Sequence, residues 1–285
     1  MLALPSSPPV AVVAAVLAAG LLHAIWNAIA KNFADVRDSF ALINIGVFLT
    51  CLVALPFVGI AESETFAYLA AAVVVHQFYE LVLMAAYKHG DLSKSYPIAR
   101  GVAPLLVSLG GFLFAGERLG ALGLLGLLVI VTGIALLAGR SLIGTSSRAP
   151  VGWALATGTA IAIYTVIDGF GVRAGTSALR YAVTLFLLQS LSWTVAVTVR
   201  RGWSWRPGPS VALAGMTGGV LSMVGYFVVL WAQTKAAMGT VSALRETGVL
   251  WASVIGIVVF REGSFRRLVP PAVLVVLGVG LLSLG

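Results

Sequence analysis

The chain has 285 residues, of which 60% are hydrophobic and only 10% are charged, and its formal net charge is +8. A soluble protein carries about 25% charged residues, so this composition excludes an ordinary soluble domain. The positive charge does not indicate a nucleic-acid partner, because Lys and Arg stand singly or in pairs between apolar runs rather than in a basic stripe. The apolar excess predicts an integral membrane protein with the lipid bilayer as its solvent.

Apolar runs of about 20 residues, the length of a helix that crosses a bilayer, recur along the whole chain. The runs are continuous rather than alternating, which predicts helices rather than the strands of a membrane barrel. The first run has no Lys or Arg before it and is too long for a signal peptide, so we expect a retained helix. The sequence predicts an all-α integral membrane protein with ten transmembrane helices at residues 10–31, 39–60, 65–87, 93–115, 120–139, 150–170, 178–199, 209–233, 236–260 and 267–284.

The Lys and Arg residues are distributed unequally among the expected loops. Of the 18, twelve lie in or beside loops that follow odd-numbered spans and four in or beside loops that follow even-numbered spans, while Arg100 and Arg245 lie well inside spans. Cytoplasmic loops are the ones enriched in positive charge, so this bias predicts that both termini face outward.

The two halves of the chain match each other at a fixed offset of 145 residues, without a gap over the matched stretch. The matched pairs are Arg100 and Arg245, Leu105 and Leu250, Ser108 and Ser253, Gly111 and Gly256, Glu117 and Glu262, Gly133 and Gly278, Leu136 and Leu281, and Leu137 and Leu282. We therefore predict two repeats, at 10–139 and 150–284, with five helices each. Because five is odd, the second repeat must enter the membrane inverted, an arrangement that recurs in secondary transporters around a central cavity.

Several segments resemble the EamA-type repeat of the drug/metabolite transporter superfamily. They are GDLSKSYPIARGVAP at 90–104, GER at 116–118, LHAIWNAIAK at 22–31, ALRETG at 243–248 and REG at 261–263. The resemblance implies ten spans in two inverted halves in the bacterial plasma (inner) membrane. It implies a central cavity walled mainly by the third, fourth, eighth and ninth helices, with the fifth and tenth at the periphery. It also favours export over import and, against the charge bias, cytoplasmic termini.

Two arginines inside predicted spans are the first candidates for a binding site. Arg100 shares a helical face with Pro97 and Pro104, which lack an N–H and so leave two backbone carbonyls open to water or substrate. Arg245 stands at the repeat-related place, next to Glu246. A charge at the bilayer centre costs at least ~2.5 kcal/mol and usually faces a cavity or a partner. We expect both arginines to bind an anionic group, with structural ion pairs as the alternative.

The span at 65–87 carries His76, Glu80 and Tyr87 on one helical stripe. His76 and Glu80 are four residues apart and are expected to form a hydrogen bond with each other. Such a pair can hold and release a proton and so couple transport to a proton gradient. The alternative is a buried structural clip between helices.

The opening helices of the two halves add further polar groups, His23, Trp26 and Asn27 in the first and Tyr164 and Asp168 in the second. We expect Asn27 and Tyr164 to bond polar groups of the substrate and Asp168 to pair with Arg100 or Arg245. Interhelical hydrogen bonding by Asn27 and an interfacial Asp168 are the alternatives. Together the expected substrate-binding residues are Trp26, Asn27, Tyr87, Tyr96, Arg100, Tyr164 and Arg245, and the proton-coupling candidates are His23, His76, Glu80, Asp168 and Glu246.

These features predict a secondary active transporter, an exporter of a small polar or anionic metabolite such as an amino acid or organic acid, working by alternating access with proton coupling. One alternative is a proton-coupled multidrug efflux pump for lipophilic cations, and another is a membrane enzyme or scaffold. We expect no enzyme activity, no cofactor and no metal, because no nucleophile motif, phosphate-cradling loop or Cys/His metal spacing occurs. The expected partners are a small-molecule substrate and the bilayer, and the expected state is a monomer or weak dimer.

Overall fold

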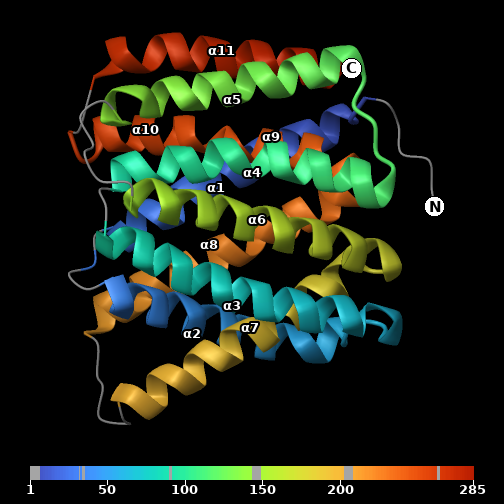
Figure 1. The fold of residues 1–285 in the computed structure, drawn as a ribbon. Coiled ribbons are helices and arrows are strands. Elements are labelled where there is room, and N and C mark those ends of the chain that lie inside the picture. The colour runs from blue at the N-terminus through green and yellow to red at the C-terminus, as the bar shows by residue number, and fades with distance from the viewer. Residues whose placement is uncertain are drawn as a thin grey trace.

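The computed structural model describes residues 7–31, 33, 36–89, 92–142, 149–201, 208–261 and 264–285, and these ranges are helical, without strands (Figure 1). The helices are α1 (Val10–Lys31), α2 (Val36–Val58), the 3-10 helix η1 (Ser63–Thr65), α3 (Phe66–His89), α4 (Leu92–Ala115), α5 (Ala121–Leu142), α6 (Ala149–Ala174), α7 (Ala178–Arg201), α8 (Pro209–Gln233), α9 (Met238–Glu246), α10 (Gly248–Val258) and α11 (Phe265–Leu284). Each expected span contains a helix of similar length, except the span at 236–260, which contains two shorter helices.

The described residues include seven helical segments that are long and apolar enough to cross a membrane. They lie in α1, α2, α3 with η1, α6, α8, α9 with α10, and α11, and two shorter apolar helices lie in α4 and α5. The prediction of a multi-pass, all-helical membrane protein is therefore confirmed at this level.

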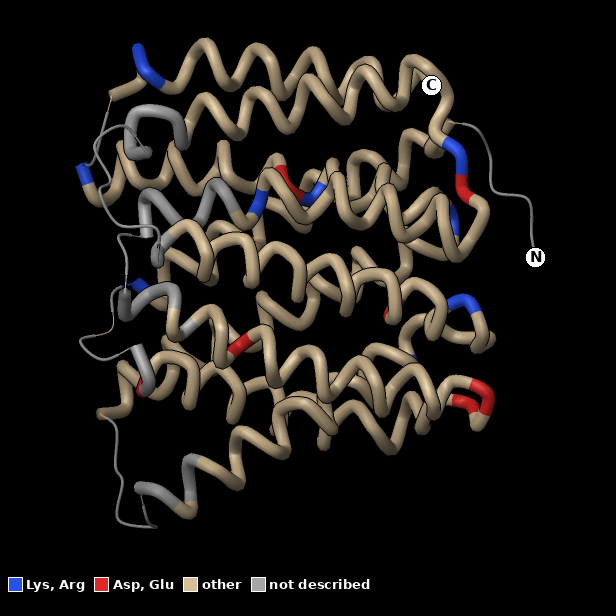
Figure 2. The backbone as a smooth tube through the Cα atoms, viewed as in Figure 1, with Lys and Arg blue, Asp and Glu red and all other residues tan. Residues whose placement is uncertain are grey.

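The outside of the bundle is more apolar than parts of its inside. Phe57 is 88% exposed and Phe114 73%, whereas the side chains of Asp168, Glu246 and Arg100 are almost completely buried. Figure 2 shows a few charged residues midway along the bundle, while most others stand near helix ends. An apolar surface around a partly charged interior is stable in hydrocarbon, since the lipid solvates the surface and the charges find partners inside.

The span expected at 236–260 is not one regular helix, which corrects that element of the prediction. It breaks at Thr247, where α9 ends and α10 begins. The backbone of Thr247 keeps helical angles (φ −59°, ψ −18°), and its N–H bonds the carbonyl of Leu244 three residues back. The Thr247 hydroxyl donates to the same carbonyl at 2.7 Å. This tightened turn follows directly after Arg245 and Glu246, so the irregular backbone lies beside the charged residues of the span.

Close helix packing depends on glycines at a few crossings. α5 and α11 pack against each other at one edge of the bundle (Figure 1). A Cβ on Gly126 would lie 2.6 Å from the carbonyl oxygen of Gly278, so only glycine permits this approach. Gly20 of α1 and Gly248 of α10 meet in the same way, with a Cβ on Gly248 only 2.8 Å from the Gly20 carbonyl. These contacts fix α1 and α10 next to each other and so place the start of α10 against the middle of the bundle.

Candidate functional site

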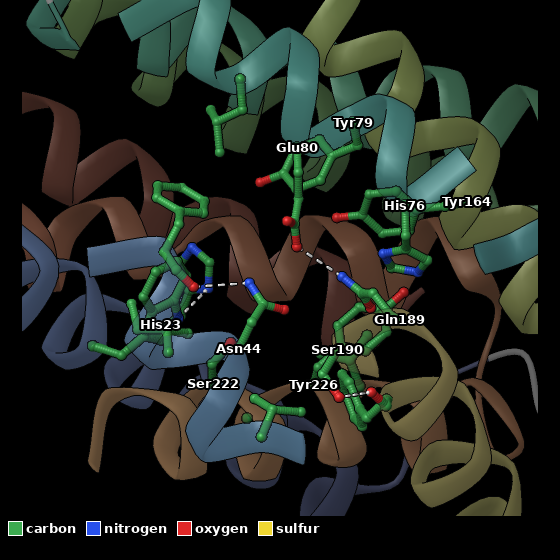
Figure 3. Close-up of a pocket in the computed structure, with 18 of the residues that line it drawn as sticks. His23, Asn44, His76, Tyr79, Glu80, Tyr164, Gln189, Ser190, Ser222 and Tyr226 are labelled. Atoms are coloured by element: carbon green, nitrogen blue, oxygen red, sulfur yellow. Dashed lines mark hydrogen bonds between the residues drawn. The ribbon is translucent and has the colours of Figure 1, made fainter. Parts of the chain in front are cut away.

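A cavity lies inside the bundle between α1, α2, α3, α4, α6, α7, α8 and α9 (Figure 3). The space between its lining residues that no atoms fill is about 960 Å³, and part of this space is open to solvent. The described residues of α5, α10 and α11 contribute nothing to its lining. The fifth and tenth expected spans correspond to α5 and α11, so their absence from the lining agrees with the peripheral place expected for them. The expectation that four helices form most of the wall is too narrow, because α1, α2 and α7 also supply lining side chains.

The two arginines converge on one carboxylate at the cavity wall. Arg100 Nη1 lies 3.3 and 3.1 Å from the two carboxylate oxygens of Glu246. Arg245 donates to Glu246 Oε1 from Nε at 3.3 Å and from Nη2 at 3.2 Å. All three residues are at most 5% exposed. Residues matched at an offset of 145 in the sequence therefore share one counter-ion, and the cluster of two cations and one anion has a net charge of +1.

His23 extends this arginine cluster toward α1. Its Nε2 contacts Nη2 of Arg100, and its Nδ1 accepts a hydrogen bond from the indole N–H of Trp26 at 3.1 Å. A neutral imidazole has one acceptor nitrogen, whereas guanidinium and indole groups only donate. His23 therefore satisfies one of these two neighbours at a time. Trp26 and His23 both line the cavity.

Asp168 is the centre of a second buried cluster. Its side chain is fully buried and accepts hydrogen bonds from Tyr181 at 2.9 Å and from Tyr226 at 2.6 Å. His76 Nε2 lies 2.9 Å from the same carboxylate. This corrects the expectation that Asp168 pairs with Arg100 or Arg245. Both arginines are bound by Glu246 instead.

Glu80 also departs from the expected pairing. His76 turns to Asp168, and Glu80 instead accepts a hydrogen bond from the side-chain amide of Gln189 at 2.9 Å. The stripe that these two residues share on α3 points them into the bundle, but neighbouring helices offer each a different partner. Figure 3 shows the Glu80 carboxylate projecting into the pocket between Asn44 and Gln189. Its second oxygen, Oε2, is buried and has no hydrogen bond of good geometry from the described residues.

Aromatic rings form much of the wall between these clusters. Tyr164 stacks on His76 with ring centroids 4.1 Å apart, and Tyr79 meets Tyr164 edge-on at 5.3 Å. The guanidinium of Arg245 lies 6.0 Å from the ring centre of Tyr226, within cation–π range. Tyr226 thus connects the two clusters, since its hydroxyl reaches Asp168 while its ring faces Arg245.

One of the expected binding residues, Asn27, does not contribute to this site. Asn27 does not line the cavity, because its amide donates to the backbone carbonyl of His23 one turn earlier in the same helix. The side chains of Tyr87 and Tyr96 lie outside the described part of the chain. Among the residues that sequence reasoning missed are Asn44, Gln189 and Tyr226. Asn44 and Gln189 stand as polar residues in the middle of apolar runs, a signal available in the sequence.

At one end of the bundle, another set of polar contacts joins helix ends to the connections between helices. Arg173, in the last turn of α6, donates to Glu117 at 2.6 Å and to the backbone carbonyls of Gln233 at 2.7 Å and Ala236 at 3.1 Å. Glu117 also accepts the backbone N–H of Met238 at 2.8 Å. One guanidinium therefore ties the α4–α5 connection to the end of α8 and the start of α9.

At the same end, Glu62 links the α2–α3 connection to the turn after α6. Its carboxylate accepts the hydroxyl of Thr176 at 2.5 Å and lies 3.6 Å from Nη1 of Arg180. The Thr176 hydrogen bond, helped by Arg180, lowers the pKa of the Glu62 carboxyl from its usual value. This contact favours the ionised form of Glu62 near neutral pH.

No known family profile and no curated protein matches the chain. Solved structures do match its fold. A structure described only as "Crystal structure of protein" aligns over 96% of this chain and 98% of its own, with a TM-score of 0.79 at 17% sequence identity. At that identity the likeness concerns the fold alone. Fold and site together define a multi-pass helical membrane protein with a charged cavity among its helices, and within the described residues no cluster of His, Cys, Asp and Glu could hold a metal ion.

Proposed function

We propose that this protein is a secondary active transporter that exports a small polar or anionic metabolite, such as an amino acid or organic acid, across the bacterial plasma membrane. The observation that carries the proposal is the convergence of Arg100 and Arg245 on one carboxylate at the wall of a cavity between helices. Two guanidinium groups are expensive to keep at membrane depth, and their usual reason for being there is to hold an anionic group or line its path.

The proposal includes ten membrane spans in two inverted five-helix repeats, with an EamA-type fold. The helix contacts support it, because they are paired as a two-fold relation requires. α1 packs extensively on α8 and on α9–α10, as α6 packs on α3 and on α4, and α5 packs on α11. The break after Glu246 supports it too, since discontinuous helices at the binding site are common in such transporters. Exchange of conformation between similar halves would alternately open the site to each side.

Proton coupling is part of the proposal, and the carboxylates of Asp168 and Glu80 are its first candidates. Asp168 is hydrogen-bonded to His76, whose ring lines the cavity, while Glu80 projects into the cavity itself. His23 and Glu246 are further candidates through their contacts with Arg100. Each of these groups either lines the cavity or contacts a residue that lines it.

The test is transport by the purified protein in liposomes, screened with labelled amino acids and organic acids under an imposed pH gradient. We expect uptake above that of empty vesicles for at least one compound, and its loss when Arg100 or Arg245 is replaced by Gln. The matched control is Arg180→Gln, which removes an arginine that contacts the α2–α3 connection at the helix ends rather than the cavity. Transport that is unchanged in both cavity variants, or no transport of any compound, would overturn the proposal.

A further inference from the structure

Opposite charges face the cavity from different helices. The arginine cluster on α4 and α9 supplies the cationic part of the wall, and Glu80 on α3 supplies an anionic part. Both arginines and Glu80 are at least nine-tenths buried, so the surrounding protein screens them poorly from one another and from a ligand. A ligand in this space therefore faces a wall that carries both a net positive group and a carboxylate.

The anionic part of the wall has unused acceptor capacity. Oε1 of Glu80 accepts the Gln189 amide N–H, which leaves the Gln189 carbonyl Oε1 as a further acceptor. Both Glu80 Oε2 and Gln189 Oε1 are buried without a hydrogen-bond partner in the described part of the chain. Asn44 and Trp193 also direct side-chain N–H groups toward the Glu80 carboxylate, but neither bonds Oε2 with good hydrogen-bond geometry. Buried acceptors are nearly always satisfied in folded proteins, so two adjacent ones indicate a place for a group with several N–H donors.

Asp168 does not offer the same opportunity, although it too is a buried carboxylate. Its Oδ1 accepts from Tyr181 and its Oδ2 from Tyr226 and His76. The oxygen atoms are thus already engaged by the protein. A protonated amine that enters the cavity finds its free acceptors at Glu80 and Gln189.

The geometry points to a zwitterionic substrate for the proposed transporter, with its carboxylate on the Arg100–Arg245 side of the cavity and its protonated amine on Glu80 and Gln189. This inference rests on the proposed function and narrows its substrate class. A zwitterion neutralises both parts of the wall, whereas a simple carboxylate leaves Glu80 without a counter-charge and a simple amine faces the arginine cluster. The rings of Tyr79 and Phe186, which also line the cavity, offer apolar contact for the remainder of the molecule.

Binding by matched compounds tests the charge requirement directly. The purified protein is first screened in detergent for thermal stabilisation by the twenty common L-amino acids, because a ligand that binds only the folded state raises the melting temperature. Phenylalanine is then compared with 3-phenylpropionate and phenethylamine, and leucine with 4-methylpentanoate and 3-methylbutylamine. We expect at least one amino acid to bind, and at least tenfold weaker binding when either charged group is missing.

The variant Glu80→Gln separates charge from shape. The variant keeps an oxygen that accepts the Gln189 N–H but loses the negative charge. The amino acid should therefore bind at least tenfold more weakly. The matched carboxylate that lacks an amine should bind no more weakly than it does to the unaltered protein. Glu64→Gln, an exposed carboxylate that contacts Ser63 at a helix end, is the matched control and should change neither. If Glu80→Gln does not fold, the comparison of matched compounds on the unaltered protein decides the question.

Two results would overturn the inference. One is equal or tighter binding of the carboxylates that lack an amine, together with unchanged amino-acid binding by Glu80→Gln. The other is no binding of any amino acid. In either case, transport of an organic anion in liposomes that depends on Arg100 would leave the proposed function standing, whereas absence of all transport would remove both.

Discussion

The replacement Glu246→Gln should weaken the fold and strengthen the binding of anions at the same time. The Glu246 side chain is fully buried and bridges Arg100 and Arg245, with four contacts between 3.1 and 3.3 Å. Glutamine keeps the shape but removes the charge, and its amide N–H₂ would face guanidinium groups that can only donate. Removing one partner of a buried ion pair costs about 3–5 kcal/mol, because the remaining charge loses its compensation.

At about 2–4 °C per kcal/mol, a loss of that size corresponds to a fall in melting temperature of roughly 6–20 °C. The loss of the Glu246 charge also leaves both arginines without a counter-ion, so the affinity for an added carboxylate should rise at least tenfold at low ionic strength. Unfolding followed by intrinsic tryptophan fluorescence, with and without the carboxylates named above, measures both effects. Glu64→Gln serves again as the exposed control. If the variant has the same melting temperature as the unaltered protein and binds anions no more tightly, Glu246 is not the shared counter-ion of the two arginines.

Three further changes test the packing and the buried polar contacts, each by thermal unfolding in detergent. Gly126→Ala should destabilise the protein by about 1–3 kcal/mol, because the new Cβ would lie 2.6 Å from backbone atoms of α11. Gly280→Ala is the control and should be nearly neutral, because its Cβ would meet nothing within 4 Å. Equal effects of the two variants would contradict the close approach of α5 and α11. Arg173→Ala should lower the free energy of unfolding by about 2–4 kcal/mol, because one ion pair and two hydrogen bonds to backbone carbonyls are lost. Arg173→Lys should recover only part of this stability, because an ammonium group cannot reproduce the geometry of the guanidinium donors. Full recovery by lysine would show that this geometry is unimportant. Tyr181→Phe should cost about 2 kcal/mol, because a buried carboxylate loses a hydroxyl donor, and a neutral result would mean that water replaces the hydroxyl.

Much of the fold follows from apolar run length, which is a local property of the sequence. A run of about 20 apolar residues has few alternatives to a helix in lipid, so the predicted bounds of α1 and α8 agree with the structure to the residue. The break at Thr247 was not predicted, because no proline interrupts the sequence between residues 236 and 260. It appears only where α10 packs against α1 through Gly248 and Gly20.

The candidate site was predicted in part, for a related reason. A charge inside an apolar run must turn toward the interior, so Arg100, Arg245 and Glu80 could be identified as interior residues from position alone. Sequence spacing also favoured a contact between His76 and Glu80, yet each bonds a residue more than ninety positions away.

The sequence by itself determined the membrane class, the helices and the charged residues that must avoid lipid. Only the tertiary structure decided which of those residues meet, that Glu246 rather than Asp168 neutralises the arginines, and that Gln189 stands beside Glu80. The physical reason is that hydropathy and helical period constrain one helix at a time. The pairing of polar side chains depends instead on the rotation and depth of each helix against its neighbours, which are set by close contacts such as that between Gly126 and Gly278.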